Sequence, residues 1–121
     1  MSELRTDTIT ASDGTSPVTL TKQSAAKVWV NFNQTGTQAI RDSFNTASLT
    51  DNGTGLSTVN FTTSLSNADY SVQNTKGEAG YRGFHSVKSL ATGSCGLDSR
   101  NDGGSEADAA IQLLTIHGDL A

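Results

Sequence analysis

The chain has 121 residues, a formal net charge of −4 at pH 7 and an apolar fraction of 34%. This length fits a single domain, which would bury about two thirds of the surface of its unfolded chain. The 8 Lys and Arg residues are scattered singly, so we expect this acidic chain to have no nucleic-acid partner. Because no apolar run is long enough for an export signal or a membrane span, we expect neither of these and no membrane partner.

Small and polar residues dominate the composition. Ser and Thr together number 32 and Gly numbers 12, whereas charged residues make up only 17% of the chain. Disordered chains usually carry more charge, and the apolar residues here are regularly spaced. These observations favour short strands joined by tight turns, and therefore an all-β fold. Cys95 is the only cysteine, so no intrachain disulfide can form, which fits assembly in a reducing cytoplasm.

Residues 1–23 form a predicted amino-terminal arm. Its few apolar side chains are separated by Thr, Ser, Asp and Gly: Leu4, Ile9, Val18 and Leu20. Because so few side chains cannot make a core, the arm must lie on its own domain, on a neighbouring molecule or in solvent. We expect intersubunit contacts to hold it, with these four side chains at the interface.

The heptapeptide Lys-Val-Trp-Val-Asn-Phe-Asn, which starts at Lys27, alternates strictly. Val28, Val30 and Phe32 would face the core of a sheet, whereas Lys27 and Trp29 would point the other way. Trp29 has two interpretations. It covers a sheet edge or the inner end of the arm, or it anchors a subunit interface, where Trp is favoured.

A turn over Gln34–Thr37 leads to a second predicted strand, in which Ile40 and Phe44 share one face. Asp42 has the same parity, which would place a carboxylate among apolar side chains. A β-bulge, or an ion pair with a nearby cation, would resolve this conflict. Farther along, Asn52-Gly53 is a dipeptide that favours the left-handed conformations of a two-residue hairpin turn.

The next segment alternates, pauses and alternates again. Val59 and Phe61 would share one face of a strand, Asn67–Asp69 supplies a turn, and Tyr70 and Val72 would share a face of the following strand. This pattern predicts a hairpin-like unit.

Several separated blocks of the chain resemble a family of small bacteriophage virion proteins, found most often in phages of aquatic bacteria and labelled tail-fibre, head-fibre or structural proteins. The resemblance covers residues 2 to 72 and rests on the order and spacing of Leu4–Thr10, Asp13–Thr15, Ser24–Thr37, Ala39–Asn45, Thr50–Gly55 and Val59–Thr62. It implies a component of the virion, without fixing its location on the particle.

The carboxy-terminal third lies outside this resemblance. Residues 74–80 are predicted to form an exposed loop. Apolar residues then recur at spacings of three, which fits a strand poorly and a short helix only partly: Tyr81, Phe84, Val87 and Leu90. Residues 94–108 are predicted to form a long surface loop. Residues 109–117 are apolar on both parities, which favours a central strand covered on both faces.

The residues capable of chemistry are few. His85, His117 and Cys95 occur in no zinc-binding spacing and no nucleophile signature, and no glycine-rich phosphate-binding motif is present. We therefore expect no enzymatic activity, no metal and no cofactor. In a helix-loop-helix calcium loop starting at Asp98, Arg100 and Ala109 would occupy ligand positions, which excludes that motif. A looser calcium site remains open, as does a simple solvated loop, and it would use Asp98, Asn101, Asp102 and Glu106.

Together the patterns predict a single antiparallel, jelly-roll-like β-sandwich over residues 24–121, preceded by the arm. We expect an exterior capsid decoration (cement) protein of a virion assembled in the host cytoplasm. It would be a homotrimer that binds the major capsid protein through its arm and intersubunit contacts. The alternative is a tail- or head-fibre accessory, in which the arm enters a tail or head adaptor. The loops at 74–80 and 94–108 would then recognise a host surface receptor, either a glycan or a protein.

Overall fold

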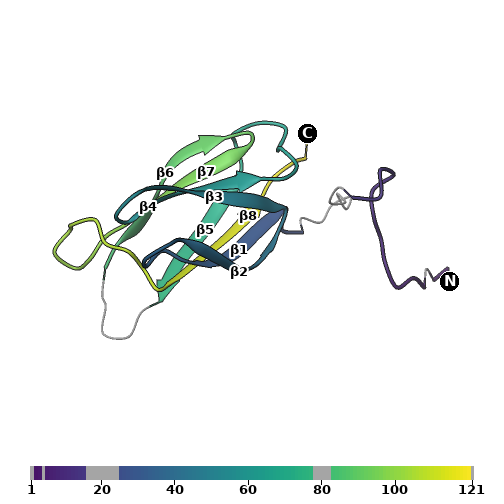
Figure 1. The fold of residues 1–121 in the computed structure, drawn as a ribbon. Coiled ribbons are helices and arrows are strands. Elements are labelled where there is room, and N and C mark those ends of the chain that lie inside the picture. The colour runs from purple at the N-terminus through teal and green to yellow at the C-terminus, as the bar shows by residue number, and fades with distance from the viewer. Residues whose placement is uncertain (1, 4, 16–24, 78–82, 121) are drawn as a thin grey trace.

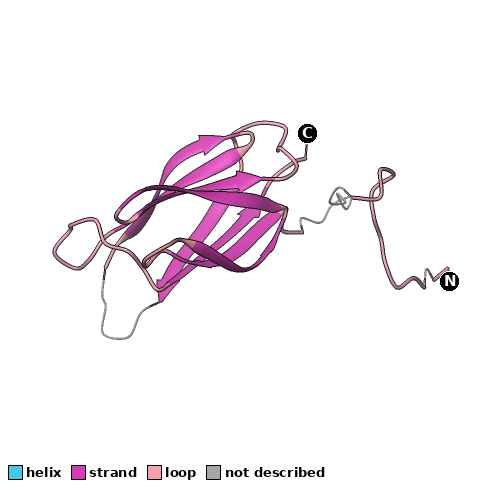
Figure 2. Ribbon diagram, viewed as in Figure 1, coloured by secondary structure: helices cyan, strands magenta, loops and turns pink. Residues whose placement is uncertain are grey.

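The computed structural model describes residues 2–3, 5–15, 25–77 and 83–120. Within these residues the fold is all-β, with eight strands and no helix (Figure 2). Two four-stranded antiparallel sheets pack face to face (Figure 1). The predicted fold class, a β-sandwich, is therefore confirmed.

One sheet, called here the β1 sheet, has the strand order β2-β1-β8-β5. Its strands are β1 (Val28–Asn33), β2 (Ala39–Phe44), β5 (Ser71–Gly77) and β8 (Ile111–His117). The other, the β4 sheet, has the order β3-β4-β7-β6. Its strands are β3 (Thr46–Gly53), β4 (Leu56–Phe61), β6 (His85–Ala91) and β7 (Ser94–Ser99). The chain changes sheet four times: between β2 and β3, between β4 and β5, between β5 and β6, and between β7 and β8.

The core lies between the sheets and confirms the alternation predicted for the first strand. Val28, Val30 and Phe32 are fully buried, and each contributes roughly 1.5–3 kcal/mol by removal from water. Lys27 was expected to point outward, and that prediction is wrong. Its side chain is buried, and its Nζ donates a hydrogen bond to the Ala25 carbonyl at 3.1 Å. Lys27 precedes the strand, so the alternation of β1 does not set its direction.

The turn between β3 and β4 is one dipeptide later than predicted. Asn52 and Gly53 end β3 beside a bulge, and the chain reverses at Thr54-Gly55, where φ of Gly55 is +73°. Distant residues hold this turn: the Gly55 amide donates to Asp108 Oδ1 at 2.7 Å, and its carbonyl accepts from the Ser99 amide at 2.8 Å. Tertiary contacts therefore override the local preference of the Asn-Gly pair.

The hairpin predicted between Val59 and Val72 is wrong, because β4 and β5 belong to different sheets. The alternation itself is correct, since both segments direct their apolar residues into the same core. The rings of Phe61 and Tyr70 meet there edge to face, with centroids 6.0 Å apart. The two segments thus face each other across the sandwich instead of pairing within one sheet.

A β-bulge at Arg41 resolves the conflict over Asp42. Asp42 pairs with Asn31 while Ile40 pairs with Phe32, so Arg41 has no partner in the β1–β2 ladder. The bulge places Ile40 opposite an inward residue and Phe44 opposite the outward Trp29. The prediction that Ile40 and Phe44 share a face is therefore wrong, and the bulge that was offered as an alternative is the reason.

The segment with apolar spacings of three is strand β6, not a helix. Its ladder with β7 skips Lys88, so that Val87 pairs with Leu97 and Leu90 pairs with Cys95. This bulge brings Val87 and Leu90 to the same side of the sheet. The predicted loop at 74–80 is also partly wrong, because residues 74–77 belong to β5, while residues 78–82, including Tyr81, lie outside the described residues.

Two predictions for the carboxy-terminal third had different outcomes. The loop expected over 94–108 begins only at Arg100, because residues 94–99 form the buried strand β7. Its Gly and Ser residues concealed the alternation of Cys95 and Leu97. The strand expected at the end of the chain is confirmed as β8, which lies between β1 and β5. Only one of its faces is buried, however, since Ile111 and Leu113 remain exposed.

Candidate interaction surfaces

The described residues of the arm, 2–3 and 5–15, form no strand or helix and are exposed except at Ala11. A local turn shapes it: the Gly14 amide donates to the Ala11 carbonyl at 2.9 Å, and the Thr15 amide donates to Asp13 Oδ1 at 2.9 Å. Ile9 keeps 59% of its surface in solvent. The other arm residues expected at an interface lie outside the described residues: Leu4, Val18 and Leu20.

Figure 1 places this arm beyond one end of the sandwich. At the inner end of the arm, Thr15 lies beside a shallow hollow of about 150 Å³ lined also by Phe44, Asn45, Thr62 and Thr63. The arm therefore meets the sandwich at the corner where β2 passes into β3.

Trp29 lies on the outer face of the β1 sheet and is 37% exposed, as its predicted outward direction requires. Three more large apolar side chains are exposed on this face, and with Trp29 they form what we call the Trp29 face: Phe44, Ile111 and Leu113. From the sequence, Phe44 was expected on the core side of its strand, and both faces of the last strand were expected to be covered. The bulge in β2 turns Phe44 to the outward side. Ile111 and Leu113 are exposed because none of the described residues covers this face of the β1 sheet.

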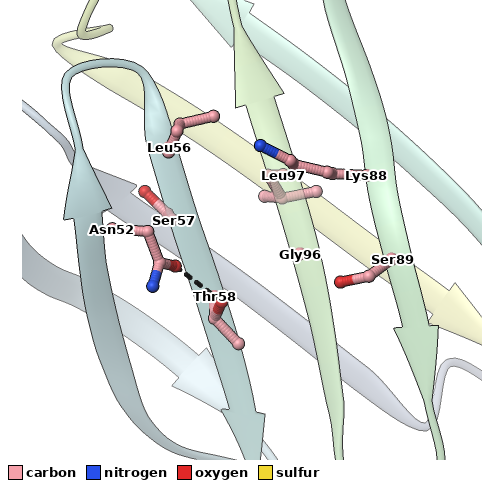
Figure 3. Close-up of a pocket in the computed structure, with 8 residues that line it drawn as sticks. All are labelled: Asn52, Leu56, Ser57, Thr58, Lys88, Ser89, Gly96 and Leu97. Atoms are coloured by element: carbon pink, nitrogen blue, oxygen red, sulfur yellow. Dashed lines mark hydrogen bonds between the residues drawn. The ribbon is translucent and has the colours of Figure 1, made fainter.

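A groove of about 470 Å³ crosses the outer face of the β4 sheet (Figure 3). Its lining comes from all four strands of that sheet or the adjoining turn: Asn52, Leu56, Ser57, Thr58, Lys88, Ser89, Gly96 and Leu97. Gly96 forms part of the floor, and a Cβ there would clash with the Ser89 hydroxyl. The depression thus depends on a missing side chain in a central strand.

The chemistry of this groove is hydrogen bonding. The Thr58 hydroxyl donates to Asn52 Oδ1 at 2.7 Å, the Ser89 hydroxyl lies across Gly96, and Lys88 brings a positive charge to the rim (Figure 3). A small polar ligand could be held by such groups. Sequence reasoning assigned none of these residues to a binding site, because Ser, Thr and Asn are common throughout this chain.

The two segments predicted to recognise a receptor, 74–80 and 94–108, touch where Lys76 Nζ of β5 donates a hydrogen bond to the Arg100 carbonyl at 2.5 Å, while residues 78–80 lie outside the described residues. The Arg100 amide donates to the Phe84 carbonyl at 2.7 Å, and the Phe84 amide donates to the Arg100 carbonyl at 3.1 Å. This end of the sandwich lies opposite the arm: β1 begins beside Ile116, and its last residues pair near Gln112, close to the point where the 100–110 loop enters β8. Arm and loops therefore occupy opposite ends of the molecule.

Arg100 contacts several residues of the loop in which the looser calcium site was predicted as one alternative. Its guanidinium contacts Asp98 Oδ2 at 2.9 Å and Glu106 Oε1 at 3.6 Å, and donates to the Gly104 carbonyl at 3.0 Å. The pKa of Arg100 is raised by its hydrogen bond to Asp98. Two of the four residues of the looser calcium site thus contact a cation of the protein itself. Among the described residues, no group of three or more His, Cys, Asp and Glu side chains is placed to hold a metal ion.

Cys95 lies in the core of the sandwich and is fully buried. Burial raises the pKa of its thiol to about 11, the opposite of the shift that activates a nucleophilic cysteine. Its neighbour Tyr70 has a pKa raised to about 12, again mainly by burial, and its hydroxyl lies 3.0 Å from the Ala91 carbonyl and 2.8 Å from the Ser94 carbonyl. This pair serves the packing of the core.

Within the described part of the chain, no helical segment has the length and hydropathy that a membrane crossing requires. In comparisons of the chain with protein-family models, with curated proteins and with solved structures, no match was found.

Proposed function

We propose that this chain is a non-enzymatic structural protein of a bacteriophage particle, an exterior capsid decoration protein that attaches through its arm. One observation carries the proposal: residues 5–15 form an exposed extension outside a sandwich that completes its own core. Such a segment adds nothing to that core but offers contact area to a neighbour. Many copies, each contributing a modest interface, would reinforce a shell by multivalent attachment.

Cosedimentation of the purified chain with parent particles tests the arm as the anchor. A variant lacking residues 2–15 should keep the far-ultraviolet circular dichroism and the cooperative unfolding of the full chain but should no longer pellet with capsids. A variant in which residues 5–15 are present but scrambled serves as the control for length. Undiminished pelleting of the truncated chain would contradict the proposal.

A second candidate function, recognition of a host surface glycan or protein, is favoured by the position of the loops. Residues 83–84 and 100–110 meet at the end of the sandwich opposite the arm, where an anchored molecule would display them. Copy number in the parent particle separates the two functions. Quantitative mass spectrometry or a cryo-electron map should show hundreds of copies for decoration, but a few dozen, confined to the tail, for recognition.

A further inference from the structure

We propose that the Trp29 face is a two-fold contact, at which a second copy of this chain binds through the same face. The exposed fractions of its members are similar and large: Trp29 37%, Phe44 40%, Ile111 39% and Leu113 38%. Isolated apolar residues on a surface are ordinary, but a contiguous group of this kind marks an interaction site.

The register of the strands makes the group contiguous. Phe44 lies directly opposite Trp29 across β2 and β1, and Leu113 lies diagonal to Trp29 across β1 and β8, because Leu113 pairs with Asn31. Ile111 follows two residues before Leu113 on the same face of β8. Direct and diagonal neighbours on a sheet are within reach of large side chains. The four side chains therefore form one stripe across three strands.

The surroundings of the stripe are almost without charge. The neighbouring outward positions carry amide and hydroxyl groups: Asn31, Gln73, Thr75 and Thr115. On the edge strand, Asp42 and Arg41 offset each other in charge, and Arg41 is bound to Asn31 Oδ1 at 3.3 Å and to the Ala110 carbonyl. An interface core is typically depleted in charge and enriched in aromatic residues. A neutral face also lets two copies of a chain with net charge −4 approach each other without facing their excess acidic groups.

The size of the face suits a second copy. Four strands at a spacing of about 4.8 Å, each six or seven residues long at about 3.3 Å per residue, make a face roughly 20 Å on each side. With the relief of its side chains, such a face offers on the order of 600–800 Å², close to the roughly 800 Å² per partner of a standard interface. The same sheet of a second copy would pack on this face at about 10 Å, the usual spacing of stacked sheets.

The same face on both copies means an isologous contact, which closes at two subunits. A three-fold ring needs two different complementary patches on each subunit, and one sheet face does not supply them. This inference therefore favours a dimer over the trimer expected from the sequence. It concerns the purified chain alone, so it stands or fails independently of where the protein sits on a particle.

Sedimentation equilibrium of the full chain over a wide concentration range tests the proposal. We expect a monomer–dimer equilibrium in the unmodified chain. Leu113→Lys places like charges near each other across the contact and should weaken dimerisation at least about 30-fold, as loss of an interface hot spot does. The control is Phe84→Lys, since Phe84 is an apolar residue with 65% exposure that precedes β6 and is not part of the Trp29 face. This control should leave the dimerisation constant unchanged.

A second variant distinguishes a loss of the dimer contact from misfolding of Leu113→Lys. Thr75 is exposed and pairs with Leu113, so Thr75→Lys adds a charge to the face without removing an apolar contact, and it too should dissociate the dimer. Circular dichroism checks the fold of each variant. A monomer at every concentration, a trimer, a dimer that survives Thr75→Lys, or a dimer that dissociates with Phe84→Lys would each overturn the proposal.

Discussion

Asn45 and Thr63 hold each other by a reciprocal pair of hydrogen bonds: the Thr63 amide donates to Asn45 Oδ1 at 2.7 Å, and Asn45 Nδ2 donates to the Thr63 carbonyl at 3.0 Å. The same Nδ2 donates to the Lys27 carbonyl at 3.0 Å. Asn45 stands where the chain leaves the β1 sheet for the β4 sheet, with φ of +54°. Its side chain thus joins the two sheets at this corner.

Asn45→Ala should lower the free energy of unfolding by about 2–4 kcal/mol, because it leaves three partly buried backbone groups without a partner and puts Ala in a left-handed conformation. Asn45→Gly removes the same hydrogen bonds but relieves the backbone, so it should cost about 1 kcal/mol less. Urea unfolding measures both losses, provided that the dependence of the free energy of unfolding on urea concentration is the same in all variants. Equal losses for Ala and Gly would show that the backbone conformation carries no strain.

Gly55→Ala should be more damaging than its left-handed φ alone explains. A Cβ at this position would clash with the Ser99 carbonyl oxygen and approach the Ala107 amide to 2.8 Å, and both are backbone atoms that cannot rotate away. Gly36 is the matched control, since its φ is +67° and nothing lies within 4 Å of an added Cβ. We expect about 1 kcal/mol for Gly36→Ala, and about 3 kcal/mol or more for Gly55→Ala, measured by thermal unfolding. Similar losses at both sites would contradict the proposed clash.

Gln34 is a buried bridge between the sheets, and its loss should be costly. Its Nε2 donates to Ser57 Oγ at 2.9 Å, and its Oε1 accepts from the Ala109 amide at 2.9 Å. Gln34→Ala should lower the free energy of unfolding by about 2–4 kcal/mol, because buried partners lose their hydrogen bonds. Gln38→Ala, at a partly exposed position on the same Ser57 hydroxyl, should cost about 1 kcal/mol or less. Denaturant unfolding that ranks the two variants in the reverse order would refute this role of Gln34.

Alkaline pH should destabilise the fold through Cys95 and Tyr70. Burial raises the pKa of Cys95 from 9.0 to about 11 and that of Tyr70 from 10.0 to about 12. Since both folded values exceed the unfolded ones, the unfolded chain releases its protons first, and stability that is complete below pH 9 is lost as the pH rises towards 12. Each shift corresponds to about 2–3 kcal/mol at most.

Urea midpoints measured from neutral to alkaline pH check this expectation. Tyr70→Phe is the control, because it removes the tyrosine contribution and should make the alkaline decline shallower while lowering the midpoint at neutral pH. A midpoint that stays constant up to pH 11 would show that neither group is held in its neutral form by the fold.

The sequence predicts the face on which a residue lies better than it predicts the partner of a strand. The alternation of Val28, Val30 and Phe32 identified the core side of β1 correctly. Phe61 and Tyr70 also reach the core as expected, but from opposite sheets. Alternation shows which side of a strand is apolar but not which strand lies next to it. The sequence pattern therefore could not distinguish a hairpin from a crossover between the two sheets.

The surfaces show the same limit. Trp29 was placed outward correctly, whereas Phe44 was assigned to the wrong face because a bulge at Arg41 shifts the parity of β2. Ile111 and Leu113 were expected to be covered, since an apolar residue facing solvent and one facing a neighbouring layer look alike in a sequence. The groove over Gly96 depends on four strands being brought together, and no local pattern records that arrangement.

The bulges at Arg41 and Lys88 both fall in outermost strands, β2 in one sheet and β6 in the other. An interrupted ladder that carries a cation at the interruption is a poor template for another chain to extend by strand addition. Even at a very high local concentration, molecules of this chain that touch along these two borders would not polymerise into fibrils there.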